Sequence, residues 1–345
     1  MTRDELDAVA QRLVSDLHAP RPAVYWADLL LSATVGWTAF AVALVADPLT
    51  PRMLVAVVVA GTALYRGLIF THELTHLRRR SLPGFETAWN ILFGVPLLLP
   101  SFTYVGVHQT HHNLSTYGTK GDPEYLPFAN SRSLLLVFAA QSSLLTPVVL
   151  PVRFLLVAPV GLLWPRFHRW LEAHASSFAM NPAYRRSVTA AGARKMRIWE
   201  TAMLAAWAAC GALVYRGTLP YRIVLLWCTV VAFVSALNTA RVLAAHEYEP
   251  DGGVRDRTGQ VRDSLDTPGG PWTELWAPVG LRYHALHHYF PGIPYHNLGI
   301  AYRRIVGTEP CGPLYQESTS PSLWHSLKTL YQKASRRAAA LAAAW

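Results

Sequence analysis

The sequence predicts an all-α integral membrane protein with four transmembrane helices in two hairpins, additional interfacial helices, and a cytoplasmic cap that carries a histidine-rich two-metal site. Three observations predict this fold. Apolar residues make up 52% of the 345 residues and charged residues only 15%, whereas an ordinary soluble domain has roughly 25% charged residues. Four apolar stretches approach the length of about 20 residues that spans a bilayer. Eight histidines are concentrated in three short segments.

The four expected transmembrane helices lie at about 29–46, 53–70, 198–215 and 221–244. The first two are joined by DPLTPR and the last two by RGTLP. Both connections are short and contain proline, as expected for helical hairpins. The remaining segments, 71–197 and 245–345, are predicted to form the cap of a single domain that extends over 1–345.

Two further apolar stretches are ambiguous. Residues 88–102 are too few to span a bilayer, and residues 134–163 are interrupted by Pro147, Pro151 and Pro159. We predict that both form interfacial or partly inserted helices. A shallow re-entrant hairpin is the alternative for 134–163.

The distribution of charge predicts the orientation. The two hairpin connections hold three Arg or Lys residues, against 25 in the segments on the other side, and positive residues stay in the cytoplasm. Both termini are therefore expected to be cytoplasmic. The net charge of +10 lies mostly beside apolar stretches, which indicates contact with anionic membrane lipid rather than nucleic acid. The three cysteines form no C-x-x-C pair, which argues against a thiolate metal cluster.

The histidines occur in the segments HELTH, HQTHH and HALHH. Residues three and four apart share one face of a helix, so each segment is predicted to direct its imidazoles toward one side. A second span extended to residue 76 is roughly 36 Å long at 1.5 Å per residue, which exceeds the apolar slab of about 30 Å. The first segment therefore reaches the cytoplasmic face. The three segments contain His72, His76, His108, His111, His112, His284, His287 and His288.

Two predicted membrane crossings separate the second histidine segment from the third, and an even number of crossings returns the chain to the same side. All three segments can therefore meet, provided that 134–163 does not cross by itself. Eight unpaired imidazoles at one membrane face would be costly, so we predict that they bind metal. A single Zn²⁺ takes three or four ligands, and two ions with four or five ligands each fit better. His246, just after the fourth span, is a ninth candidate. Imidazole suits Fe, Zn, Cu and Ni alike.

The three segments resemble the histidine boxes of the membrane fatty acid desaturase and hydroxylase superfamily, which read H-x(3–4)-H, H-x(2–3)-H-H and H/Q-x(2–3)-H-H. Their order and their placement after the second and fourth spans match as well. The resemblance covers roughly 29–300, and the segments NTARVLAAHEYEPDGG and 273–298 are similar to the bacterial branch. It implies two iron ions at the cytoplasmic face of the bacterial inner membrane, with O₂ as co-substrate.

The resemblance also implies a reaction, namely oxidation of an unactivated C–H bond of a fatty acid or acyl thioester. Desaturation is the favoured outcome, and the same ligands support two alternatives, hydroxylation and oxidative decarboxylation to a terminal alkene. No cytochrome b5 pattern is fused to the chain, so a separate electron donor is expected, such as ferredoxin with its reductase.

Several polar residues are candidates to support this site. An acidic side chain can orient a ligating imidazole by accepting its second N–H. Arg241, near the end of the fourth span, is expected to pair with an acid or with an anionic substrate head group. Some family members carry an asparagine one turn before the extra histidine; that position is Val242 here, and the nearest asparagine is Asn238. The acidic candidates are Glu73, Asp122, Glu124, Glu247 and Asp266.

Two rival interpretations belong to other classes of protein. HELTH fits the H-E-x-x-H motif of zinc proteases, with Glu73 as general base, but a protease leaves HQTHH and HALHH unexplained. A non-enzymatic carrier of metal or lipid would load metal reversibly without consuming O₂.

Overall fold

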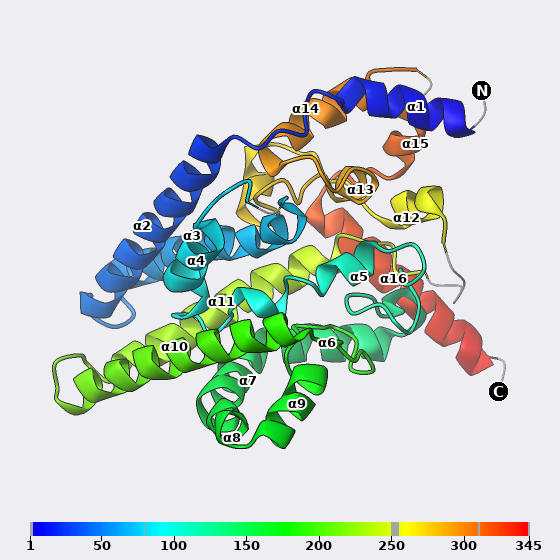
Figure 1. The fold of residues 1–345 in the computed structure, drawn as a ribbon. Coiled ribbons are helices and arrows are strands. Elements are labelled where there is room, and N and C mark those ends of the chain that lie inside the picture. The colour runs from blue at the N-terminus through cyan, green and yellow to red at the C-terminus, as the bar shows by residue number, and fades with distance from the viewer. Residues whose placement is uncertain (1–2, 79, 250–254, 310, 344–345) are drawn as a thin grey trace.

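The computed structural model describes residues 3–78, 80–249, 255–309 and 311–343. Within these residues the chain is helical and contains no β-strand (Figure 1). The α-helices are α1 Arg3–Val14, α2 Pro22–Val45, α3 Pro51–His76, α4 Phe85–Trp89, α5 His108–His112, α6 Arg132–Leu144, α7 Thr146–Pro151, α8 Ala158–Leu163, α9 Pro165–His174, α10 Ala190–Tyr215, α11 Arg222–Leu243, α12 Arg257–Asp263, α13 His284–Tyr289, α14 Tyr295–Val306, α15 Gly312–Glu317 and α16 Leu323–Ala343. Short π-helical segments occupy Asn90–Gly94 and Val152–Val157, and 3₁₀ turns occupy Ser101–Thr103, Phe128–Asn130 and Pro271–Leu275.

The four predicted spans correspond to α2, α3, α10 and α11, each long and apolar enough to cross a membrane. Local sequence explains where two of them begin. Pro51 is the first residue of α3, and the Thr50 hydroxyl accepts a hydrogen bond from the Met53 amide at 3.4 Å, as an N-cap does. Thr189 caps α10 in the same way. Because of this cap, α10 begins several residues before the apolar stretch that predicted it.

The stretch 146–163 differs from the prediction. It forms a continuous helical run that qualifies by length and composition as a fifth candidate span. Its prolines do not interrupt it. Pro147 lies in the first turn of the run, where no amide donor is needed, and Pro151 and Pro159 lie on either side of the π-helical segment Val152–Val157, where the hydrogen-bond register changes. The chain then reverses, and α9 packs back on α8. The run and α9 thus form a hairpin, which keeps the histidine segments before and after it at the same end of the molecule.

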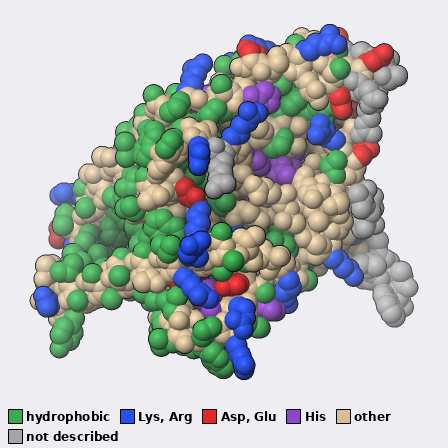
Figure 2. Space-filling model, in the orientation of Figure 1, with side chains coloured by type: hydrophobic (Ala, Val, Ile, Leu, Met, Phe, Trp, Pro, Cys, Tyr) green, Lys and Arg blue, Asp and Glu red, His purple; other side chains and the backbone are tan. Residues whose placement is uncertain are grey.

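The surface of these helices is apolar on one side. Large aliphatic side chains are exposed on α2, α3, α7, α8, α10 and α11, and Figure 2 shows apolar side chains gathered over α2, α3 and α10. Only 11% of the apolar window of α10 is buried within the protein. Apolar patches of this extent mark a surface that contacts lipid or another apolar partner. The exposed apolar surface of these helices therefore indicates a membrane protein.

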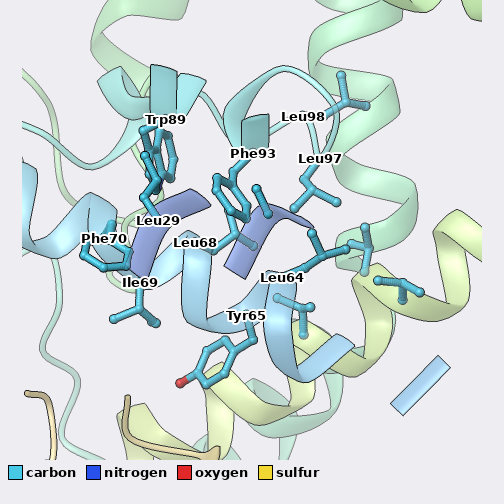
Figure 3. Close-up of a cluster of buried hydrophobic side chains, with 14 of the residues drawn as sticks. Leu29, Leu64, Tyr65, Leu68, Ile69, Phe70, Trp89, Phe93, Leu97 and Leu98 are labelled. Atoms are coloured by element: carbon cyan, nitrogen blue, oxygen red, sulfur yellow. The ribbon is translucent and has the colours of Figure 1, made fainter. Parts of the chain in front are cut away.

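The core of the helical bundle lies around α3. Leu64, Leu68 and Phe70 pack against Trp89 and Phe93 (Figure 3). The close approach requires a glycine, because a Cβ on Gly67 would lie 2.0 Å from the Phe93 ring. The Trp89 indole N–H donates to the Gly67 carbonyl at 2.8 Å. This contact joins the long helix that carries the first histidines to the segment that leads toward the second.

We expect Gly67→Ala to lower the free energy of unfolding by about 1–3 kcal/mol, because the added methyl group overpacks the contact with Phe93. Gly211→Ala is the matched control. Gly211 is also a helical glycine, but its Cβ would meet no atom within 4 Å, so the control should be neutral or stabilising by up to about 1 kcal/mol. Thermal unfolding in detergent measures both. Equal stability of the two variants would contradict the packing argument.

Two smaller apolar clusters lie outside the main core. One joins α1 to α12–α15 and includes Val14, Leu286 and Tyr315. The other joins the segment 117–139 to α11 and α16. These clusters hold α13 and the loop after α5 against the end of the helical bundle, where α3 and α11 end.

Candidate metal centre

Four separate segments bring the nine predicted histidines together. His72 and His76 lie in the last turns of α3, HQTHH forms α5, HALHH begins α13, and His246 follows the end of α11. The side chains form two groups, and within each group the ligand nitrogens lie within 4.8 Å of one another. The first group consists of His72, His76, His108, His112 and His287, and the second of His111, His246, His284 and His288.

Helix geometry explains why each H-x-x-H-H segment contributes to both groups. Residues four apart share a face, so the Nε2 atoms of His108 and His112 approach to 2.9 Å. His111 directly precedes His112, so its side chain is rotated by about 100° around the helix axis from that of His112 and points to the other group. α13 repeats this arrangement in reverse: His284 and His288 approach to 3.1 Å in the second group, and His287 points to the first. The spacing predicts that all three histidines of a segment lie on one side, and the structure corrects this prediction.

The imidazole nitrogens meet without the partners that buried polar atoms normally have. Both ring nitrogens of His72 are buried and lack a hydrogen bond, and a metal ion would supply the missing partner of one of them. The facing Nε2 pairs, such as His246 and His284 at 2.9 Å, converge as ligands of a shared ion do. Since unsatisfied buried polar groups are rare, these two donor sets fit a pair of bound metal ions.

The protonation of the rings suits metal binding. Burial lowers the pKa of His108, His246 and His288 well below the usual value, and the charges of neighbouring groups lower it further. Their rings are therefore neutral at pH 7 and present a lone pair, which a ligating imidazole requires. His111 differs: burial lowers its pKa, but Asp122, Glu124 and Asp263 together raise the pKa by more.

Two of the predicted acidic residues contact histidines. The Nδ1 of His108 lies 2.8 Å from Glu124 Oε1, and the Nδ1 of His111 lies 2.9 Å from Asp122. An ionised carboxylate only accepts hydrogen bonds, so it places the proton on Nδ1 and directs the Nε2 lone pair into the centre. Asp122 also accepts the amides of Gly118 and Glu124. A tight turn in which Gly118 has φ 69° thus holds the carboxylate.

Two supporting residues were missed by the sequence analysis. The Nδ1 of His246 lies 2.9 Å from the Tyr117 hydroxyl, which donates to Asp263 at 2.8 Å. Asp263 also accepts from the Tyr125 hydroxyl at 2.9 Å. Tyr117 follows HQTHH closely, but the sequence positions of Tyr117 and Asp263 do not distinguish them from ordinary loop residues. Only the packing of α12 against the loop after α5 reveals the contact.

The other predicted residues lie elsewhere. Glu73 accepts hydrogen bonds from the Tyr25 hydroxyl and from the Tyr295 amide, and its carboxylate is 3.9 Å from His72 Nδ1. Glu247 forms an ion pair with Lys333 of α16 rather than with an imidazole. Asp266 accepts from the Leu286 amide at 3.2 Å and so holds the first turn of α13; burial raises its pKa to about 7.

A cavity of about 210 Å³ includes His72 in its lining. It lies between α3, α6 and α11, and Leu68, Leu99 and Phe138 are among its apolar lining residues. Arg241 and Asn238 line it as well, and the Arg241 guanidinium donates to Asn238 Oδ1 at 3.0 Å. An elongated apolar molecule in this space would reach the first histidine group.

Comparison with known proteins places the chain in a family. The family model of the fatty acid desaturases matches residues 48–317. A ceramide hydroxylase of Caulobacter vibrioides is 38% identical over 328 residues, which cover 94% of this chain and 92% of that protein. The family match extends from α3 to α15, and both matches include all three histidine segments. The chain therefore belongs to the fatty acid desaturase family.

Proposed function

We propose that this protein is a membrane di-iron oxidase that uses O₂ and external electrons to attack an unactivated C–H bond of an acyl lipid. The observation that carries the proposal is the division of nine histidines into groups of five and four at the end of an apolar cavity. Two adjacent imidazole sets of this size exceed what one zinc ion takes. An apolar cavity beside them suits an alkyl chain as substrate.

Iron is the metal that the family favours, since imidazole by itself accepts several metals. When bound, the two iron ions supply the reduction of O₂ and the removal of a hydrogen atom. The protein contributes what its own side chains can do. Asp122, Glu124 and Tyr117 fix the rings of three ligands, and the burial of the centre excludes water from the reacting carbon.

Two outcomes follow from the same hydrogen removal. Hydroxylation is favoured by the similar ceramide hydroxylase, and desaturation by the family model. Both consume O₂ together with external electrons; the first leaves one oxygen atom on the chain, and the second leaves none. Oxidative decarboxylation of a free fatty acid would use the same ligands. A fatty acid, an acyl thioester and an N-acyl lipid such as ceramide are the substrate classes to compare.

We infer the location and partners from charge. The segments at the histidine end of the helices hold most of the Arg and Lys residues, which supports a cytoplasmic centre with both termini on the same side of a bacterial inner membrane. A separate donor such as ferredoxin with its reductase would deliver electrons there.

One assay tests the proposal. The purified protein, loaded with iron in bilayer nanodiscs, is given a reducing system, O₂ and the three substrate classes, and products are identified by mass spectrometry. We expect O₂-dependent products that carry one added oxygen or one new double bond. A carrier would bind iron and lipid but consume no O₂, and that result would refute the enzymatic proposal.

The zinc protease alternative makes a different prediction for Glu73→Gln. In an oxidase Glu73 only joins α3 to Tyr25 and Tyr295, so we expect turnover to fall less than about tenfold with some loss of thermal stability. Removing the general base of a protease costs about 10²- to 10⁴-fold. O₂-dependent lipid oxidation and peptide hydrolysis are measured on the same preparations. A loss of lipid oxidation beyond about a hundredfold would assign Glu73 a direct role in the chemistry.

A further inference from the structure

The cavity that reaches His72 is lined by apolar residues together with several polar and charged ones. α3 and α11 both run toward the histidine centre, so later residues on each helix lie nearer to it. Leu68 and Val234 line the apolar part, one or two turns before the polar residues. Near the centre the lining includes the polar residues Thr71, Tyr104, Glu124, Asn238 and Arg241 beside the apolar Val242 and Leu281. The part of the cavity near the histidines therefore offers polar and charged groups to a ligand.

Arg241 is the cation at this end, and it lacks an acidic partner. Its guanidinium donates to Asn238 Oδ1, whereas its Nε is buried without a hydrogen bond. Within the described part of the chain, no ion pair at 4.0 Å or less joins it to a carboxylate. An arginine remains charged in proteins, and an unpaired charge near the end of a membrane helix is costly. Arg241 also lines the cavity, so its guanidinium is within reach of a ligand bound there.

The position of this charge relative to the histidines adds a second constraint. Arg241 lies close enough to His72 of the first group, and to His246 and His284 of the second, for its charge to act on all three. Two metal ions would add further positive charge beside it. Glu124 of the same lining offsets part of this charge. An oxygen-rich or anionic ligand in the cavity would offset more of it, within reach of the centre.

We propose that Arg241, together with Asn238, binds the carboxylate or carbonyl oxygen of the acyl substrate and thereby presents the carbons beside that head group to the metal centre. This inference rests on the proposed function and specifies its substrate orientation. The tail then occupies the apolar part of the cavity, away from the histidines. Oxidation falls on the carbons next to the head group. A mid-chain reaction would instead need apolar lining on both sides of the centre.

Binding without turnover gives the first test. The assay measures displacement of a fluorescent acyl probe from the protein in nanodiscs, under argon and without reductant. The competing ligands are hexadecanoic acid, N-hexadecanoyl-sphinganine and hexadecane. We expect the wild type to bind at least one of the two head-bearing ligands at least about tenfold more tightly than hexadecane. Arg241→Met should remove that preference and Arg241→Lys should restore part of it. A loss of affinity for hexadecanoic acid would identify the acceptor as a carboxylate. A loss of affinity for N-hexadecanoyl-sphinganine would identify it as an amide carbonyl.

Arg222→Met is the matched control. Arg222 lies at the opposite end of α11, where its guanidinium donates to the Ala46 carbonyl, so this variant should keep the preference for the head group. If Arg241→Met does not fold, Asn238→Leu tests the same ligand comparison. An unchanged ratio between head-bearing ligands and hexadecane in the folded variant would overturn the assignment.

The position of oxidation gives the second test. The wild type should oxidise carbons beside the head group, and Arg241→Met should spread the products along the chain, with a larger effect on KM than on kcat. Unchanged product positions would refute the orientation that we propose. A wild type that binds through Arg241 but consumes no O₂ would refute the oxidase proposal and leave the head-group contact standing, so the two failures are distinguishable.

Discussion

His284→Ala is expected to remove about one of two bound iron ions per protein and to lower the rate of lipid oxidation by at least about a hundredfold. His284 belongs to the group of four histidines, so its loss leaves three ligands. His287→Ala should be milder for iron content, because the group of five retains four ligands. The two groups thus predict different iron occupancies for two substitutions in the same short helix. Elemental analysis of iron and product formation measure both effects.

His174→Ala serves as the control for these substitutions. His174 is exposed at the end of α9, where its ring interacts with the Trp170 carbonyl of its own helix, and the variant should keep both iron and activity. Full iron occupancy and normal turnover in His284→Ala would exclude His284 as a ligand. Equal iron loss in the two ligand variants would contradict the division into five and four.

Asp122→Ala is expected to weaken iron binding by about 10- to 100-fold and to lower the free energy of unfolding by about 3–5 kcal/mol. Asp122 is fully buried and accepts from His111 at 2.9 Å and from two backbone amides. Its removal leaves three donors unsatisfied and frees the ring of His111 to rotate. Competition with a chelator measures the iron affinity, and thermal unfolding of the iron-free protein measures the stability.

Asp16→Ala is the matched control, because Asp16 also pairs with a cation, Arg304, but its side chain is 60% exposed. An exposed ion pair contributes at most about 1 kcal/mol, so this variant should retain normal iron affinity and nearly normal stability. Asp122→Asn keeps one acceptor oxygen and should fall between the two. Were Asp122→Ala to bind iron as tightly as the wild type, the carboxylate would have no part in orienting the ligand.

The fold was predictable to the extent that apolar length determines a membrane helix. The four stretches that predicted α2, α3, α10 and α11 are uninterrupted, and any helix of that composition must bury or immerse its surface. The prolines of 134–163 predict interruptions, but the helix continues through 146–163. Pro147 occupies its first turn, and Pro151 and Pro159 flank a π-helical segment. Sequence shows the proline but not the hydrogen-bonding pattern around it.

The supporting residues of the metal centre show a similar limit. Asp122 and Glu124 were found because they follow HQTHH within one loop. Glu247 adjoins His246 in sequence, yet it pairs with Lys333, because neighbouring residues of an extended segment point to opposite sides. Tyr117 and Asp263 are separated by 146 positions and meet through a hydrogen bond that no local pattern encodes.

The sequence by itself determined the membrane class, the number of imidazoles and their gathering at one end of the helices, because hydropathy, residue type and the spacing of three and four are local properties of a helical chain. Only the tertiary structure decided which histidine joins which group, which acid holds which ring, and that Arg241 faces the cavity without a carboxylate partner. These outcomes depend on the rotation and packing of helices that are distant in sequence, and side-chain direction at such contacts is set by the whole core rather than by any one segment.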